Sequence, residues 1–406
     1  MGVTIGPVSE DRAADFLRTM GAAFGFDIED EDRVRRFSDV FEWDRSRGAF
    51  EGDQIVGTAG AFSLDLTVPG GTLPCAGTTV ISVLPTHRRR GILRSMMDSH
   101  LDDVRQREEP IAGLWASDSA IYGRFGYGSA AQSVEVEVSR EHGNFHRLAP
   151  PAAPIRLVSA QEARRLLPPF YDRFRLTTPG FYGRSEQWWD LRRFRDDPGD
   201  RNGATAYRYA VTETDGELTG YVQYRYKENW DEGHGEGEVR VRELLGTDPS
   251  SWAGLWRFIL NHDLTAKIVA PERSPRDPLF EMLEGRRRAR QKLEDSIWIR
   301  IMDVEKALEG RSYSARADVV VEIHDPLDAS TSVWHLDLTP EGSVVSPSKE
   351  TPDVAMDLED LGACFLGWSR FTDLARAGRL TGEDGHLLAL DHAFSWSPVP
   401  WCSEVF

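Results

Sequence analysis

The same order of predicted elements occurs twice in the first three quarters of the chain. Within residues 9–115, an amphipathic helix precedes two strand-like runs with a turn at 51–53, an apolar strand, a second helix and another short strand. Within residues 159–262, a helix, a hairpin turning at 215–216, a strand and a helix follow in the same order. Internal similarity of this kind indicates a duplication. We therefore predict two copies of one α/β (α+β) domain, each a mixed sheet flanked by helices.

A linker and a change of pattern divide the chain into three segments. The Pro- and Ala-rich stretch LAPPAAP lies at 148–154, and the repeated order ends near residue 300. The last segment has strand patterns (VVVEI, WHLDL) followed by helical ones (MDLEDLGACFLGW, FTDLARAGRL) and resembles neither copy. A chain of 406 residues is long enough for two or three domains. We predict domains at 1–150, 151–298 and 299–406.

The composition excludes several classes of protein. Acidic residues outnumber basic ones by 66 to 48, a formal net charge of −18, which argues against nucleic acid as a partner and favours cationic small molecules. Cys75, Cys364 and Cys402 lie far apart, and the ten histidines are scattered, so we expect neither disulfides nor a metal site. No apolar run approaches the ~18 residues of a membrane span, and the start lacks a signal-peptide core. We expect a soluble, cytoplasmic protein.

Three consecutive arginines, Arg88 to Arg90, stand between an apolar strand and a helix. The helix dipole is positive there, so cations are disfavoured unless an anion binds beside them. Free N–H groups at a helix start bind phosphate oxygens, and Gly91 permits close approach. The second copy has LGTDPSSW at this place, without the arginines or the glycine. The contrast favours an anion site over the alternative, a solvated basic turn; the P-loop and dinucleotide patterns are both absent.

Two long motifs carry a resemblance to a known family. The stretches VLPTHRRRGILRSM and LWASDSAIYGRFGYGSA resemble those of the Eis ("enhanced intracellular survival") group of GNAT N-acetyltransferases. Leu93 stands where most GNAT proteins have Gly or Ala, and the Eis group tolerates leucine there. The resemblance covers the whole chain and implies a catalytic GNAT domain, a degenerate second GNAT-like domain and a sterol-carrier-like C-terminal domain. It also implies a homohexamer that uses acetyl-CoA as co-substrate, without a metal.

The resemblance also assigns cofactor-binding residues. The strand backbone of Ile81, Ser82 and Val83 would bind the pantetheine arm. The pyrophosphate would lie against Arg89, Arg90, Gly91, Ile92, Leu93 and Arg94. Ser117 and Asp118 would touch the cofactor beside the next strand.

A general acid and a base complete the expected chemistry. A tyrosine, with a pKa near 10, can protonate a thiolate whose conjugate acid has a pKa of roughly 8.5. By resemblance this acid is Tyr122, the alternative being an aromatic pair of Tyr122 and Tyr127 packed in a Gly-rich turn. The family also implies that the base is the C-terminal carboxylate of Phe406. The ending WCSEVF is apolar enough to dock, and a simply packed terminus is the alternative.

The acceptor is the least constrained part of the prediction. An acidic run, Asp27, Glu29, Asp30, Glu31 and Asp32, follows the first helix. By itself such a run is typical of a solvated loop, whereas the resemblance implies that it borders an acidic acceptor cavity. We expect multi-amine acceptors, such as aminoglycosides or polyamines, and lysine side chains of proteins as a further class. A rival hypothesis is a lipid- or sterol-binding module whose GNAT portion is inactive. Phe41 and Trp43 would serve either as cavity wall or as core.

Overall fold

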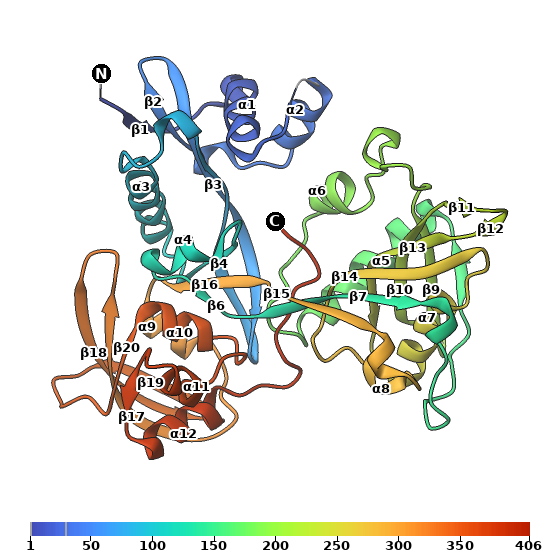
Figure 1. Cartoon of the computed structure of the whole chain (residues 1–406). Helices are drawn as coiled ribbons and strands as arrows, with labels where there is room; N and C mark the ends of the chain where they lie inside the picture. The colour runs from blue at the N-terminus through green and yellow to red at the C-terminus, as the bar shows by residue number, and fades with distance from the viewer. Residues whose placement is uncertain (1, 29–30) are drawn as a thin grey trace. The chain divides into compact units, whose positions relative to one another are not determined.

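The structure, a computed structural model, describes residues 2–28 and 31–406, and it divides into two compact units. The first unit contains the chain up to Ala131, then Ile297–Ser397 and Val405–Phe406. The second unit contains Gln132–Ser296 and Pro398–Glu404. Figure 1 shows the chain coloured from one end to the other, with the elements labelled.

The first unit is built on a seven-stranded sheet. Its strands run in the order β1 (Thr4–Gly6), β2 (Arg47–Glu51), β3 (Gln54–Val68), β4 (Gly71–Val83), β5 (Ile111–Trp115), β16 (Ile297–Ile301) and β6 (Gly128–Ser129). Only β4 and β5 pair in parallel; the other neighbours are antiparallel. The helices that accompany this sheet are α1 (Ala13–Phe24), α2 (Glu31–Ser38), α3 (Ile92–Gln106) and α4 (Ser119–Tyr122).

The first copy contains the predicted hairpin, with a later start to the first helix. The β2–β3 turn lies at residues 51–53, as the pattern indicates. The first helix lies within the predicted segment and begins at Ala13, because residues 10–12 form a 3₁₀ turn. Ser9 precedes that turn, and its side chain makes no capping hydrogen bond.

The second unit repeats the arrangement of the first sheet. From one edge its strands are β8 (Arg156–Val158), β9 (Arg208–Thr214), β10 (Glu217–Lys227), β13 (Gly237–Gly246), β14 (Thr265–Arg273), β7 (Gln132–Ser139) and β15 (Arg290–Asp295). Again only the fourth and fifth strands, β13 and β14, are parallel. The other elements are α5 (Ala160–Arg175), α6 (Glu186–Trp188), α7 (Pro249–Leu260), α8 (Leu279–Met282), β11 (Trp230–Asp231) and β12 (His234–Gly235).

The two sheets exchange a strand, which the sequence pattern did not reveal. β7 follows β6 along the chain and takes the sixth place in the second sheet. β16 follows β15 and takes the sixth place in the first sheet. An exchange leaves no single point along the chain where one sheet ends and the next begins, so the domain boundaries after residues 150 and 298 stay predictions.

The C-terminal segment of the first unit forms a five-stranded sheet with four helices. Its strands run in the order β19 (Gly342–Pro347), β18 (Ser330–Thr339), β17 (Ala317–Asp325), β20 (Val354–Asp357) and β21 (Thr381–Gly382). The helices are α9 (Val304–Glu309), α10 (Leu358–Cys364), α11 (Phe371–Arg376) and α12 (Asp384–Phe394). Helix α10 packs closely against β6 because residue 128 is a glycine. A Cβ on Gly128 would collide with the backbone of Glu359 and Ala363 in α10.

The described residues contain neither a helix that could span a membrane nor a cluster of metal-binding side chains. Among them, no helix is both long and apolar enough to cross a membrane. Within the same residues, no group of three or more His, Cys, Asp and Glu side chains is arranged to hold a metal ion.

Candidate active site

A bulge near the end of β4 separates this strand from β5. The two strands pair only over Cys75–Thr78 and Ile111–Leu114, although β4 continues to Val83. The register between β3 and β4 shifts at Thr58/Gly60, and Val80 has a positive φ of 50°. Thr58 Oγ1 donates to the Val80 carbonyl at 2.7 Å. The last residues of β4 therefore line a gap in the sheet.

The turn from β4 into α3 has two residues with left-handed backbone conformation. Arg89 has φ 63° and Gly91, the residue before the helix, has φ 80°. This conformation costs a non-glycine residue about 1–2 kcal/mol, and such strain is typical of functional sites. A Cβ on Gly91 would meet no atom within 4 Å, so the turn faces open space. The first N–H groups of α3 have no carbonyl partner within the helix.

The three arginines of this turn have different surroundings. Arg88 donates to the Ala23 carbonyl at 3.2 Å and so ties the turn to the end of α1. Arg90 forms an ion pair with Glu51 at 2.9 Å. Arg89 has neither contact and lines a pocket. Of the three, Arg89 is the guanidinium most available to an anion.

One pocket of about 740 Å³ brings together most of the residues predicted to bind the cofactor. It lies among the end of β4, the start of α3, the loop after β5 and the end of α1. The predicted residues on its wall are Ile81, Ser82, Val83, Arg89, Gly91, Ile92, Leu93, Arg94, Ser117, Asp118 and Tyr122. Arg90 and Phe406 are not among its lining residues.

Tyr122 lies at the end of α4, on the wall of this pocket. The Asp118 carboxylate caps that helix by accepting from the Ala120 N–H at 3.0 Å. The tyrosine is 5% exposed, and burial raises its pKa, partly offset by a hydrogen bond with Ser117. A raised pKa keeps the phenol protonated at neutral pH, as a general acid requires.

Tyr127, the other tyrosine of the motif, is part of the core. It is fully buried, and burial raises the pKa of its phenol. Its hydroxyl lies 3.1 Å from Thr78 Oγ1, which in turn lies 2.8 Å from Nε2 of His100. Burial lowers the pKa of His100 to about 3, so this histidine is neutral. The rings of Tyr122 and Tyr127 pack edge to face, with their centroids 6.3 Å apart, so Tyr127 supports the ring of Tyr122.

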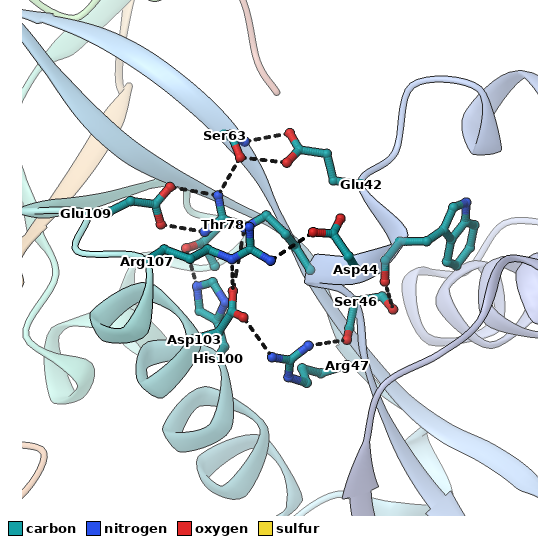
Figure 2. A network of polar contacts seen from close by, with 12 residues as sticks. Glu42, Asp44, Ser46, Arg47, Ser63, Thr78, His100, Asp103, Arg107 and Glu109 are labelled. Carbon is teal, nitrogen blue, oxygen red and sulfur yellow. Dashed lines mark hydrogen bonds and ion pairs between the residues drawn. The ribbon is translucent and has the colours of Figure 1, made fainter.

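A polar network fixes the far end of α3 (Figure 2). Arg45, 1% exposed, donates to both oxygens of Glu109, at 2.8 and 2.5 Å. Asp103 of α3 accepts from Arg47 and Arg107, each at 3.0 Å. These bonds join the helix to β2 and to the segment before it, so the helix start keeps its position beside the pocket.

The acidic run lies only partly within the described residues. Glu29 and Asp30 lie outside them, while Glu31 and Asp32 form the first turn of α2. Phe41 belongs to the core, since it is 5% exposed and packs against an aromatic cluster. Its ring centroid lies 4.8 Å from that of Phe37 and 4.9 Å from that of Trp43.

Comparisons with known proteins agree with this geometry. Two family models described as "Acetyltransferase (GNAT) domain" match residues 4–130 and 180–301, and a "Sterol carrier protein domain" matches residues 304–403. An uncharacterized N-acetyltransferase of Streptomyces avermitilis is 36% identical over 393 residues, 96% of each chain. The N-acetyltransferase Eis of Mycobacterium tuberculosis is 35% identical over 364 residues, 87% of this chain and 86% of the relative. The chain belongs to the Eis family of GNAT N-acetyltransferases.

A solved structure of the Eis family has the same fold. The crystal structure of Eis1 from Mycobacterium abscessus matches with a TM-score of 0.84 and 28% identity, covering all of both chains. The predicted fold class, tandem GNAT domains with a sterol-carrier-like C-terminal domain, is confirmed. The predicted activity class, N-acetyltransferase, is confirmed as well. GNAT acetyltransferases use acetyl-CoA as the acetyl donor.

The C-terminus of this Eis-family chain docks on β4. Phe406 is 6% exposed, and Thr79 Oγ1 donates to a terminal oxygen of Phe406 at 3.3 Å. A Cβ on Gly77 would lie 3.3 Å from the Phe406 ring, so the glycine leaves room for it. Thr79 directly precedes the bulge residue Val80, so the terminal carboxylate lies at the bulge, although it is not part of the pocket wall.

The sterol-carrier-like segment supplies residues that no sequence motif indicated. Pro326, after β17, lines the pocket, and Arg94 of α3 donates to the neighbouring Leu327 carbonyl. Arg300 of β16, 2% exposed, pairs with Asp325 and donates to the Phe125 carbonyl at 2.7 Å. These contacts hold the start of α3 and the loop after Tyr122.

In the second GNAT copy the start of the equivalent helix is capped by the chain itself. Asp248 caps α7 by accepting from the N–H groups of Ser250 and Ser251 at 2.9 and 3.0 Å. Pro249 at the first helical position has no N–H to offer. The donors that would bind a phosphate are therefore occupied or missing, which explains why the arginines are absent from this copy.

Proposed function

We propose that this enzyme transfers the acetyl group of acetyl-CoA to an amino group of a small multi-amine acceptor. In this reaction the neutral amine attacks the thioester carbonyl, a C–N bond forms and the C–S bond breaks. The leaving thiolate gains a proton and the amine loses one. The observation that carries the proposal is that Tyr122 and the Arg89–Gly91 turn share one pocket.

The donor half of the pocket suits a coenzyme. Arg89 and the open N-terminus of α3 offer positive charge and N–H groups to a pyrophosphate. The backbone of Ile81, Ser82 and Val83, beyond the last pair of the β4–β5 ladder, offers edge hydrogen bonds to the pantetheine arm. Ser117 and Asp118 face the same space.

Tyr122 is the proposed general acid, and the Phe406 carboxylate is the proposed base. A buried phenol that is protonated at neutral pH and lies on the pocket wall can donate a proton to the leaving thiolate. The carboxylate attracts the protonated amine and accepts its proton directly or through water. Its contact with Thr79, beside the bulge, supports this role.

The proposed acceptor carries several amino groups, as polyamines and aminoglycosides do. The formal net charge of −18 attracts such cations electrostatically. Protein lysine side chains are a further class of acceptor. The rival function, a lipid- or sterol-binding module with an inactive GNAT portion, is less well supported, since the pocket retains both its anion-binding turn and its tyrosine.

Thiol release from acetyl-CoA tests the proposal, with a polyamine, an aminoglycoside and a lysine peptide as acceptors. We expect turnover with the small multi-amine compounds. Tyr122→Phe is expected to lower kcat about 10²–10⁴-fold, with coenzyme A affinity unchanged. Tyr127→Phe is the matched control, because its hydroxyl bonds to Thr78 in the core. Unchanged turnover in Tyr122→Phe would remove the general acid, and failure to bind coenzyme A would favour the lipid-binding module.

A further inference from the structure

The second unit has a pocket of about 630 Å³ at the place that corresponds to the cofactor pocket of the first unit. The cofactor pocket lies among the end of the fourth strand, the start of the following helix, the loop after the fifth strand and the end of the first helix. The pocket of the second unit lies among the equivalent elements, β13, α7, the loop after β14 and α5. The duplicated fold has therefore kept a cavity where the second copy lost its phosphate site.

This second pocket cannot take the ligand of the first. Asp248 occupies the N–H groups at the start of α7, and its carboxylate repels a phosphate. Gly246 precedes the helix start, and a Cβ on it would lie 3.3 Å from Trp252. The indole therefore lies against the end of β13, so the ligand has to be compatible with an aromatic wall.

Aromatic rings form much of that wall. The lining includes Phe170, Phe174, Trp252 and Trp401; Trp252 is partly buried, and the other three rings belong to the core of the unit and expose only an edge to the pocket, with Trp401 4% exposed. Arg273, 1% exposed, lies next to both indoles, 5.8 Å from the Trp252 ring centroid and 5.1 Å from that of Trp401. Such a surface binds the flat or apolar body of a small molecule.

The charges of the pocket favour an anionic group on that body. Arg276 and Arg173 both line the pocket, and among the described residues Arg276 has no ion-pair partner. Of the two carboxylates on the wall, Asp277 is neutralised by Arg273, which donates to it at 2.6 and 3.0 Å. The other, Glu217, is exposed at the start of β10, and Arg173 and Arg276 are exposed as well. The guanidinium of Arg276 thus remains without a counter-charge.

We infer that this pocket is a second ligand site, which takes a small organic carboxylate with an aromatic or apolar body. The carboxylate pairs with the planar guanidinium of Arg276, for which bidentate contact is favourable. The apolar body lies against Trp252 and Trp401. Since Trp401 belongs to the C-terminal tail, a bound ligand contacts the segment that leads to Phe406.

Binding of 2-naphthoate to the full chain tests this site, measured by calorimetry and by saturation-transfer NMR. The experiment is run with saturating coenzyme A, so that the first pocket is occupied. We expect 2-naphthoate to bind, and the neutral isostere 2-naphthamide to bind at least tenfold more weakly. Arg276→Met is expected to weaken naphthoate binding at least tenfold.

The matched control is Arg287→Met, an exposed arginine of the same unit that does not line the pocket. This variant should bind naphthoate as the parent chain does. Three results would each overturn the inference: equal affinity for 2-naphthoate and 2-naphthamide, unchanged 2-naphthoate affinity in Arg276→Met, or no 2-naphthoate binding up to millimolar concentration. Binding of naphthoate that is seen only in a parallel titration without coenzyme A would assign it to the first pocket and overturn the inference as well.

Discussion

Substitution of the neighbouring arginines Arg89 and Arg90 separates cofactor binding from surface electrostatics. Arg89 lines the pocket, and Arg90 forms an ion pair with Glu51, with side chains 43% and 33% exposed. Loss of a charge-assisted hydrogen bond to a pyrophosphate costs about 1.5–3 kcal/mol. Arg89→Ala should therefore raise the Kd for coenzyme A about 10- to 150-fold. Arg90→Ala loses an exposed pair worth about 0–1 kcal/mol of stability and should bind coenzyme A almost normally.

Calorimetric titration with coenzyme A measures the Kd of both variants, and thermal unfolding of the free proteins checks that the variants fold. Arg89→Gly is the third variant, since glycine adopts the positive φ of residue 89 without strain. Its affinity for coenzyme A should fall as much as that of Arg89→Ala, although the glycine removes the backbone strain at residue 89. Normal binding by Arg89→Ala, or tenfold weaker binding by Arg90→Ala alone, would refute this assignment of the two side chains.

Three further predictions concern the terminus and two buried charges. A short extension after Phe406 should displace the carboxylate and abolish turnover without changing the circular dichroism spectrum; full turnover would exclude the terminal base. Asp325→Asn leaves buried Arg300 without its ion-pair partner, so calorimetry should show about 3–5 kcal/mol less stability, together with a lower kcat. Burial raises the pKa of Glu272 to about 7, so its ionisation increasingly opposes folding as the pH rises from 4.5 to 7. Glu272→Gln should stabilise the protein by about 1–3 kcal/mol above pH 7 and hardly at all below pH 4.5, and a pH-independent difference would contradict the cause.

The fold class could be predicted because its signals are local. Alternating and helical apolar patterns, turn residues at 51–53 and 215–216, and one linker were enough to indicate two similar α/β units. The turn before α3 could also be singled out, since arginines are disfavoured at a helix start unless an anion lies beside them, and its role as a phosphate site stays a prediction. The distinction between Arg89 and Arg90 could not, because Glu51, the partner of Arg90, is 39 residues away in sequence.

By itself, the sequence of this protein determined its helices, strands and the motif before α3, because each depends on neighbouring residues, and the repeated order of these elements indicated the duplication. Only the tertiary structure decided which strand completes each sheet, since β16 pairs with β5 and β7 pairs with β14, strands that lie far from them along the chain. It also decided that Arg94 donates a hydrogen bond to the Leu327 carbonyl and that Thr79 donates one to a terminal oxygen of Phe406. Such contacts join positions more than 200 residues apart, and no local periodicity encodes them.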